Sequence, residues 1–122
     1  MPVPNLLPLY VSDPAASQAF YERLLGRKPL GVFPTYVAFD FDGRLMLGLW
    51  SMQAKNFVSG GSGHRSELAF MVESEADVHR LHDEWRAAGV AIEQEPMNAV
   101  FGLTFVALDP DGHRLRVCLP DK

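Results

Sequence analysis

Two segments of this sequence resemble each other closely enough to indicate an internal repeat. Residues 36–43 read YVAFDFDG and residues 105–112 read FVALDPDG, so a valine, an alanine, two aspartates and a glycine recur in the same order. The short apolar segments 9–11 (LYV) and 70–72 (FMV) also resemble each other at a similar spacing, and each precedes a helical pattern. Similarity at a spacing of about sixty residues indicates two copies of one supersecondary unit.

The first copy is expected to begin with a strand and a helix. Residues 6–11 form a short apolar run typical of a buried strand. Asp13 is suited to cap the helix that follows, with Pro14 at its first position, where a missing N–H has no cost. Gly26 is expected to end this helix. The apolar stripe of the helix recurs every fourth residue, at Ala16, Phe20 and Leu24.

The second copy follows the same order. Residues 68–72 are expected to form its strand, Ser74 to cap its helix and Gly89 to end it. The buried face of this helix is expected at Val78, Leu81 and Trp85, and we expect Phe20 and Trp85 to be core residues.

Extended segments follow each predicted helix. They are residues 35–41 and 45–50 in the first copy, and 103–108 and 115–119 in the second. Each pair flanks an Asp-Gly dipeptide, which strongly favours a hairpin turn because both residues tolerate a positive φ. The intervening stretch 59–63 (SGGSG) has the composition of a flexible linker. We therefore expect one domain over 1–122, with module 1 at about 1–58 and module 2 at about 64–122.

Composition and charge exclude several functional classes. None of the apolar stretches in the 122 residues approaches the roughly 18 residues needed to span a bilayer. A net charge of −4 without a basic run argues against a nucleic-acid partner. Cys118 is the only cysteine, which excludes an internal disulfide, and we expect it to pack as a small hydrophobic residue. The first residues lack the basic region of a signal peptide, so we expect a cytoplasmic protein without a membrane partner.

The doubled unit of a strand, a helix and further strands resembles the vicinal oxygen chelate superfamily, which includes glyoxalase I, extradiol dioxygenases, fosfomycin resistance enzymes and bleomycin resistance proteins. The segments that carry the resemblance are 9–13 (LYVSD), 19–21 (AFY), 24–26 (LLG) and 109–115 (DPDGHRL). The resemblance implies an α+β fold in which two tandem βαβββ modules form a curved mixed sheet around a ligand cavity. It also implies a homodimer, since many members are dimers.

The resemblance further implies where a metal ion would be held. Metal-dependent members place His and Glu ligands at the start of the first strand and in the last strand of each module. Counted from the strand valines and the turn glycines, the corresponding positions here are Leu6, Leu47, Glu67 and Arg116. One carboxylate and one cation cannot hold a divalent ion in that manner. We therefore expect neither a metal ion nor another cofactor.

The four histidines do not restore a ligand set. His64 lies near the start of the second module, beside a glycine of the predicted linker, and is expected to be a solvated loop residue. His79 and His82 fall on the second predicted helix, and His113 falls beside a hairpin turn. Surface positions are expected for these three.

Glu67 and Arg116 are the candidates for a ligand site. If they face one cavity from neighbouring strands, burial requires them to pair. Such a pair is either structural, or it opens to orient a polar group of a ligand, because arginine can hold a carboxylate or phosphate through two hydrogen bonds. The aromatic candidates for an apolar pocket are Trp50, near a strand end, and Phe101, in a loop. Leu6 and Leu47 would complete its lining, and Phe33 is expected in the core.

The function predicted first is metal-free binding of a small organic molecule in an aromatic-lined cavity. Residues 102–116 resemble the bleomycin-resistance branch, because Arg116 stands where the enzymes have a glutamate. The resemblance to that branch implies antibiotic sequestration, by members that hold a flat, cationic drug. Two enzymatic alternatives stay open: a metal-dependent lyase, isomerase or dioxygenase-related enzyme of the glyoxalase type, and a metal-free enzyme with Glu67 as general base.

Overall fold

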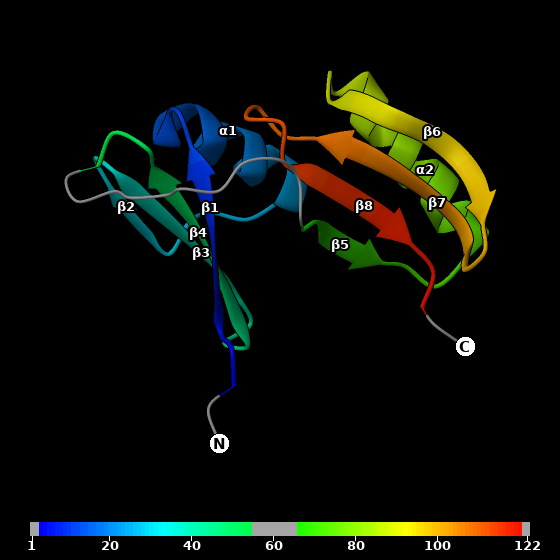
Figure 1. Cartoon of the computed structure of the whole chain (residues 1–122), viewed down its shortest axis with the longest axis horizontal. Helices are drawn as coiled ribbons and strands as arrows, with labels where there is room; N and C mark the ends of the chain where they lie inside the picture. Colours follow the sequence, from blue (N-terminus) through cyan, green and yellow to red (C-terminus); the bar gives the residue numbers. More distant parts are fainter. Residues whose placement is uncertain (1–2, 55–65, 121–122) are drawn as a thin grey trace. The chain divides into compact units, whose positions relative to one another are not determined.

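The computed structural model describes residues 3–54 and 66–120, which fall into two compact units, 1–61 and 62–122. Each unit consists of one four-stranded sheet with one helix packed on it (Figure 1). The linker predicted at 59–63 and His64 lie outside the described residues. That the two units form a single domain, and that they enclose a cavity, stay predictions.

Unit 1 has the strand order β1-β4-β3-β2. Its outer strand β1 pairs in parallel with β4, whereas the remaining neighbours pair antiparallel. A parallel pair needs a long crossover, which the helix and the two following strands provide. The elements are β1 (Leu6–Val11), α1 (Pro14–Leu25), β2 (Gly31–Phe33), β3 (Tyr36–Phe41) and β4 (Leu45–Ser51).

Unit 2 repeats this topology with the strand order β5-β8-β7-β6. Again the first strand pairs in parallel with the last, and the others pair antiparallel. The elements are β5 (Leu68–Met71), α2 (Glu75–Ala87), β6 (Ala91–Ala99), β7 (Gly102–Leu108) and β8 (Arg114–Cys118). The predicted α+β class and the two tandem βαβββ modules are thereby confirmed, as two separate four-stranded sheets.

Both helices are capped as the sequence predicts. The Asp13 carboxylate accepts a hydrogen bond from the Ala15 N–H at 3.1 Å, and Gly26 ends α1 in the left-handed conformation, with φ 65°. The Ser74 hydroxyl accepts from the Asp77 N–H at 3.2 Å at the start of α2. These contacts satisfy N–H groups that a helix start otherwise leaves unpaired.

The core of each unit lies between its helix and one face of its sheet. Phe20 and Trp85 are core residues, as predicted. The stripe of α1 is rotated from the predicted one, because Ser17 and Tyr21 are fully buried while Ala16 is exposed. A serine and a tyrosine in the core were not expected from hydrophobic spacing. Phe33, expected in the core, is instead exposed.

Two strands were not assigned from residue patterns alone. β2 has only three residues, and β6 (AIEQEPMNA) carries two glutamates and a proline. Both are outer strands, where charge and proline are tolerated because one edge makes no ladder bonds. The pairing of β6 with β7 shifts register on both sides of Gln94, and Pro96 lies in the second shift. Neither α1 nor α2 is long and apolar enough to cross a membrane.

Candidate functional site

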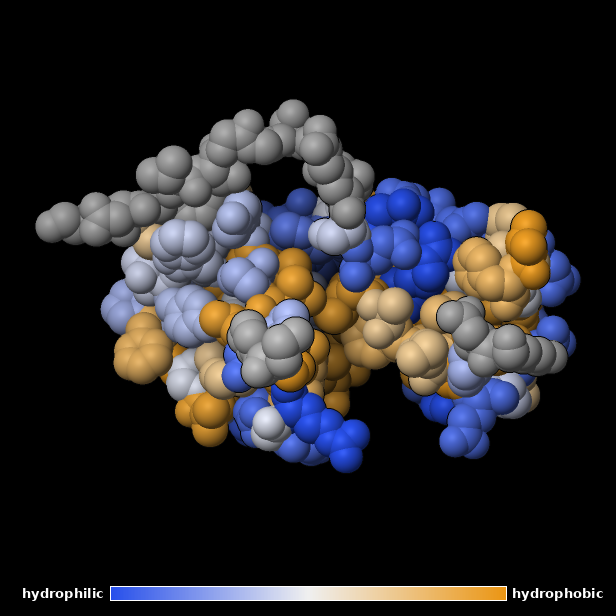
Figure 2. All heavy atoms as spheres, turned by 60° about the horizontal axis from the view of Figure 1, so that its bottom comes forward, coloured by the Kyte–Doolittle hydropathy of each residue, from blue (hydrophilic) through white to orange (hydrophobic). Residues whose placement is uncertain are grey.

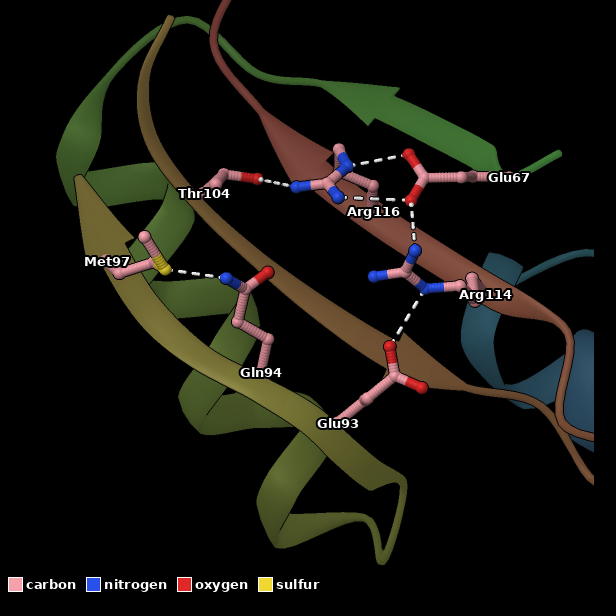
Figure 3. Close-up of polar contacts among 7 residues, drawn as sticks. All are labelled: Glu67, Glu93, Gln94, Met97, Thr104, Arg114 and Arg116. Atoms are coloured by element: carbon pink, nitrogen blue, oxygen red, sulfur yellow. Dashed lines mark hydrogen bonds and ion pairs between the residues drawn. The ribbon is translucent and has the colours of Figure 1, made fainter. Parts of the chain in front are cut away.

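The charged residues of the candidate site lie on the face of the unit 2 sheet that α2 does not cover (Figure 3). Alternation along β8 sets this arrangement, because successive side chains point to opposite faces. Leu115 and Val117 are fully buried on the α2 side, whereas Arg114 and Arg116 point the other way. Arg116 is paired with Ala69 of β5, and Glu67 precedes Ala69 by two residues, so it shares this face.

Glu67 and Arg116 form an ion pair with two hydrogen bonds. Arg116 Nε donates to Glu67 Oε1 at 2.6 Å, and Arg116 Nη2 donates to Oε2 at 3.0 Å. The Arg116 side chain is 18% exposed and the Glu67 side chain is 27% exposed, so both are partly withdrawn from water. A parallel fork of this kind is among the stronger polar contacts in proteins, because both partners are charged and the geometry is fixed.

A threonine fixes the other end of the guanidinium. Arg116 Nη1 donates to Thr104 Oγ1 at 3.1 Å, and the Thr104 hydroxyl in turn donates to the Val117 carbonyl at 2.7 Å. Thr104 is fully buried on β7. The guanidinium therefore spans three strands, held by Glu67 beside β5 and by Thr104 on β7.

A second arginine extends the network. Arg114 Nη1 lies 3.2 Å from Glu67 Oε2, and Arg114 Nε lies 2.8 Å from Glu93 Oε1 on β6. Arg116, Glu67, Arg114 and Glu93 thus form a chain of contacts in which positive and negative charges alternate, and their formal charges cancel. An anionic ligand would meet a site whose cations are already paired.

The ion pair also sets the protonation state of Glu67. Hydrogen bonds from Arg116 are the largest influence and lower the pKa of Glu67, while partial burial acts in the opposite direction. The same hydrogen bonds raise the pKa of Arg116, again against the effect of burial. Glu67 is therefore an ionised carboxylate at neutral pH and a weak proton acceptor.

Exposed apolar side chains surround this network. The Arg116 Cζ atom lies 5.7 Å from the centre of the Phe101 ring, which is within cation–π range. Phe101 follows β6 at the turn into β7 and is 50% exposed. Met71 and Met97 are also exposed, and each is paired with a residue on the same face, Cys118 and Thr104 respectively. Hydrophobic side chains reach the surface in both units (Figure 2).

The corresponding face of unit 1 is mostly apolar, with Asp40 at one end beside Met46. Leu6, Tyr10 and Trp50 share it, because the register pairs Leu6 with Met46 and Tyr10 with Trp50. The rings of Tyr10 and Trp50 meet edge to face, with their centres 6.1 Å apart. Leu6 is 46% exposed, so the face is accessible at that end of β1.

Leu47 does not belong to this face, which corrects its place in the predicted site. It is fully buried on the α1 side, paired with Leu7. The residue at the position of Arg116 in unit 1 is Gly48, because Gly48 pairs with Pro8 of β1 as Arg116 pairs with Ala69 of β5, and segments 9–11 and 70–72 match. A Cβ at Gly48 would stand 2.5 Å from Tyr36 Oη, so the Tyr36 side chain occupies the space that a larger residue would need.

The two hairpins explain the error. In unit 1, Asp42 and Gly43 are the central turn residues, and Arg44 N–H bonds to the Phe41 carbonyl at 3.0 Å. The two connections differ in length, because residues 42–44 join Phe41 to its partner Leu45, whereas residues 109–113 join Leu108 to its partner Arg114. As a result Gly48 lies five residues beyond Gly43, but Arg116 lies four beyond Gly112. Counting from the glycine therefore lands one residue away, and a shift of one residue places a side chain on the opposite face.

The described histidines make no metal site. In residues 3–54 and 66–120, no group of three or more His, Cys, Asp and Glu side chains is placed to hold an ion. His82, expected at the surface, is buried, and its ring contacts Phe105 edge-on. Its Nε2 lies 2.9 Å from Glu95 Oε1, so it links α2 to β6. His82 is therefore a structural residue rather than a ligand of the site.

The residue patterns did not single out three members of the network, Thr104, Arg114 and Glu93. Arg114 had a usable signal, because the alternation of 114–118 (RLRVC) places it on the same face as Arg116. No pattern in the sequence pointed to Glu93 or Thr104, because these residues join the network only through the pairing of β6, β7 and β8.

Comparison with known proteins places the whole chain among related sequences. Residues 4–117 match the family model of the Glyoxalase/Bleomycin resistance protein/Dioxygenase superfamily. The phenazine antibiotic resistance protein EhpR of Enterobacter agglomerans is 36% identical over 94% of this chain and 90% of its own length. The glutathione transferase FosA of Serratia marcescens is 33% identical over 93% of this chain and 77% of its own.

Solved structures show the same fold. Protein ATC0852 from Agrobacterium tumefaciens is 44% identical, covers the whole of both chains and superposes with a TM-score of 0.84. A lactoylglutathione lyase from the same organism is 24% identical over 94% of this chain and 91% of its own, with a TM-score of 0.73. At that identity the likeness concerns the fold alone, because this fold supports many unrelated chemistries.

Proposed function

The chain belongs to the Glyoxalase/Bleomycin resistance protein/Dioxygenase superfamily, and we propose that it binds a small organic molecule, without a metal ion, in the manner of its antibiotic-resistance members. The observation that carries this proposal is the fork between Glu67 and Arg116, flanked by Phe101. Small-molecule sites are mostly apolar with a few fixed polar groups, which describes this face of unit 2. Trp50 and Leu6 are proposed as apolar ligand-binding residues of the corresponding face of unit 1.

The donor set does not fit a divalent ion of the kind that the superfamily implies. Of the positions aligned with its ligands, Leu6 and Gly48 offer no donor side chain, and Arg116 is a cation. Glu67 is the one carboxylate among them and is already bound by Arg116 through both oxygens. A divalent ion needs several neutral or anionic donors, so no step of the proposed function uses a metal.

Catalysis by Glu67 is the second candidate function, favoured by the likeness to the glutathione transferase FosA. A general base should have a pKa near the working pH, whereas hydrogen bonds from Arg116 lower the pKa of Glu67. Glu67 would become a base only after Arg116 had released it. The other enzymatic alternative is a metal-dependent lyase or isomerase. Metal analysis of the purified protein distinguishes it from the metal-free functions, because a stoichiometric divalent ion would favour the metal-dependent enzyme.

The proposal is tested by ligand screening followed by one substitution. A thermal-shift screen with phenazine, glycopeptide, polyketide and dicarbonyl compounds identifies a binder, because a ligand of the folded state raises the melting temperature. We predict that Arg116→Ala weakens the affinity for that binder by about tenfold or more, as expected when one charge-assisted contact is lost.

Arg27→Ala is the matched control. Arg27 lies 5.5 Å from the Phe41 ring in unit 1, so it repeats the arginine–aromatic contact outside the proposed site. We expect it to leave the affinity unchanged. An unchanged affinity in Arg116→Ala would contradict the proposed site. Homodimerisation, a cytoplasmic location and the absence of nucleic-acid and membrane partners remain predictions beside it.

A further inference from the structure

The manner in which Arg116 is held indicates the chemical class of the ligand. Its guanidinium is anchored at three nitrogens: Nε and Nη2 donate to Glu67, and Nη1 donates to Thr104. These hydrogen bonds lie in the plane of the group, so they use its edges and leave its faces. An arginine fixed in this way presents a rigid, flat, cationic surface.

Charge argues against an anionic ligand. Glu67 occupies the fork that a ligand carboxylate would need, and Arg114 is already shared between Glu67 and Glu93. A carboxylate would have to displace a bidentate partner and leave Glu67 without Arg116 in a partly buried place, which is costly. The pairing does not block contact with an aromatic ring, because that attraction acts through the faces of the guanidinium.

The surroundings of Arg116 favour an aromatic ligand. Phe101 already lies against the guanidinium, with its ring centre 5.7 Å from Cζ. Met71 and Met97 are exposed residues on the same side of the sheet, and thioether sulfur makes favourable contacts with aromatic rings. The Met97 sulfur also accepts a hydrogen bond from Gln94 Nε2 at 2.6 Å (Figure 3).

We propose that the unit 2 face is a stacking site for an uncharged, flat, aromatic ring system, with the Arg116 guanidinium as its platform, and is not a site for an organic anion. This inference rests on the proposed function and names its ligand class. Glu67 and Thr104 act as positioning residues, because they orient the guanidinium without touching the ligand. The ring lies against the guanidinium next to Phe101.

A matched pair of probes tests the inference. Phenazine is an uncharged three-ring heterocycle, and phenazine-1-carboxylate is the same ring system with one anionic group. We expect phenazine to bind the unaltered protein at least as tightly as the carboxylate in equilibrium dialysis at neutral pH. Arg116→Lys keeps the charge and removes the plane, and we expect it to weaken phenazine binding by about tenfold. Arg27→Lys is the matched control and should change the affinity for phenazine by less than about threefold.

A second variant separates the two ligand classes. Glu67→Gln removes the charge that holds the fork of Arg116, so we expect it to tighten the binding of phenazine-1-carboxylate by about tenfold. Because Glu67 also orients the guanidinium, the same variant should weaken, and not tighten, the binding of phenazine. Unaltered affinity for phenazine in Arg116→Lys would overturn the inference. So would tenfold tighter binding of the carboxylate than of phenazine to the unaltered protein, although this result would leave the proposed function in place.

Absence of binding by both probes would also overturn the stacking site. The proposed function has a separate criterion, because it fails only if the broader screen yields no binder, or if Arg116→Ala leaves the affinity for an identified binder unchanged. The two failures are therefore distinguishable.

Discussion

Glu67 makes the stability of unit 2 depend on pH. Its pKa in the folded protein is lowered from an ordinary value of 4.5, chiefly by hydrogen bonds from Arg116. A carboxyl group of this kind stabilises the fold above its unfolded pKa, and the contribution is lost as the pH falls through the folded pKa. We predict that Glu67→Gln lowers the free energy of unfolding at neutral pH, and that the difference from the unaltered protein shrinks steadily below pH 4.5.

Urea denaturation across this pH range measures the difference. In an Arg116→Gln background the same Glu67→Gln substitution should show a much weaker pH dependence, because the cause of the lowered pKa has been removed. A difference that grows as the pH falls would contradict the assignment.

Ser17 offers a test of a buried polar group. Its side chain is fully buried on α1, and among the described residues its hydroxyl has no hydrogen-bond partner. Such a group loses its contacts with water without compensation, at a cost of about 1–3 kcal/mol. We predict that Ser17→Ala raises the melting temperature, since alanine also has the higher helix propensity.

Ser74→Ala is the opposing control for the Ser17 prediction. The Ser74 hydroxyl caps α2, so its loss should lower stability by about 1 kcal/mol. A fall in melting temperature in Ser17→Ala would show that the Ser17 hydroxyl is satisfied in solution.

At the level of elements, the contact of β3 with β4 can be tested through Gly48. A Cβ at this position would lie 2.5 Å from Tyr36 Oη and 2.8 Å from Tyr36 Cε1. The tyrosine side chain must therefore move in Gly48→Ala, and we predict a loss of roughly 1–3 kcal/mol in the free energy of unfolding. In a Tyr36→Ala background the same substitution should cost clearly less. Equal costs in both backgrounds would contradict the contact.

Most elements could be predicted from residue patterns, because their signals are local. The bounds of β1 agree with the predicted 6–11, and the helix caps at Asp13 and Ser74 are also confirmed. Strand β6 could not be assigned from its own residues, since Glu93, Glu95 and Pro96 are tolerated there only because β6 lies at the sheet edge. That position is a property of the assembled sheet.

Less of the candidate site could be predicted, because some of its residues come together only through strand pairing. Glu67 and Arg116 were named from the positions that the superfamily resemblance implies, and the structure pairs the two side chains. Their role in binding a ligand stays a prediction. The face of the sheet predicted for Leu47 was wrong, because the position of a glycine within a turn does not fix the register of the strand that follows. Thr104 and Glu93 could be found only from strand pairing.

At the level of the whole molecule, the two units have one topology and chemically different exposed faces. Unit 1 presents Leu6, Tyr10 and Trp50, whereas unit 2 presents a network of paired charges. Large apolar side chains are exposed in both units, among them Val32, Phe33 and Val100. Exposed apolar groups of this kind favour association.

We predict a homodimer on this basis. Light scattering coupled to size exclusion should give twice the chain mass of 13.6 kDa. A dilution series at neutral pH serves as the control, because a specific dimer dissociates to a single lower mass instead of spreading over larger species. A mass of one chain at micromolar concentration would contradict this prediction.

The two thioethers at the edges of the unit 2 face have a consequence for how the protein tolerates oxidants. Met71 is 68% exposed and Met97 is 44% exposed, so both side chains meet solvent, and the Met97 sulfur also accepts a hydrogen bond from Gln94 Nε2. Conversion to sulfoxide replaces a polarisable apolar contact with a polar S–O group. Oxidation of either side chain would therefore weaken the proposed stacking of an aromatic ring on this face, and methionine sulfoxide reductases would restore it.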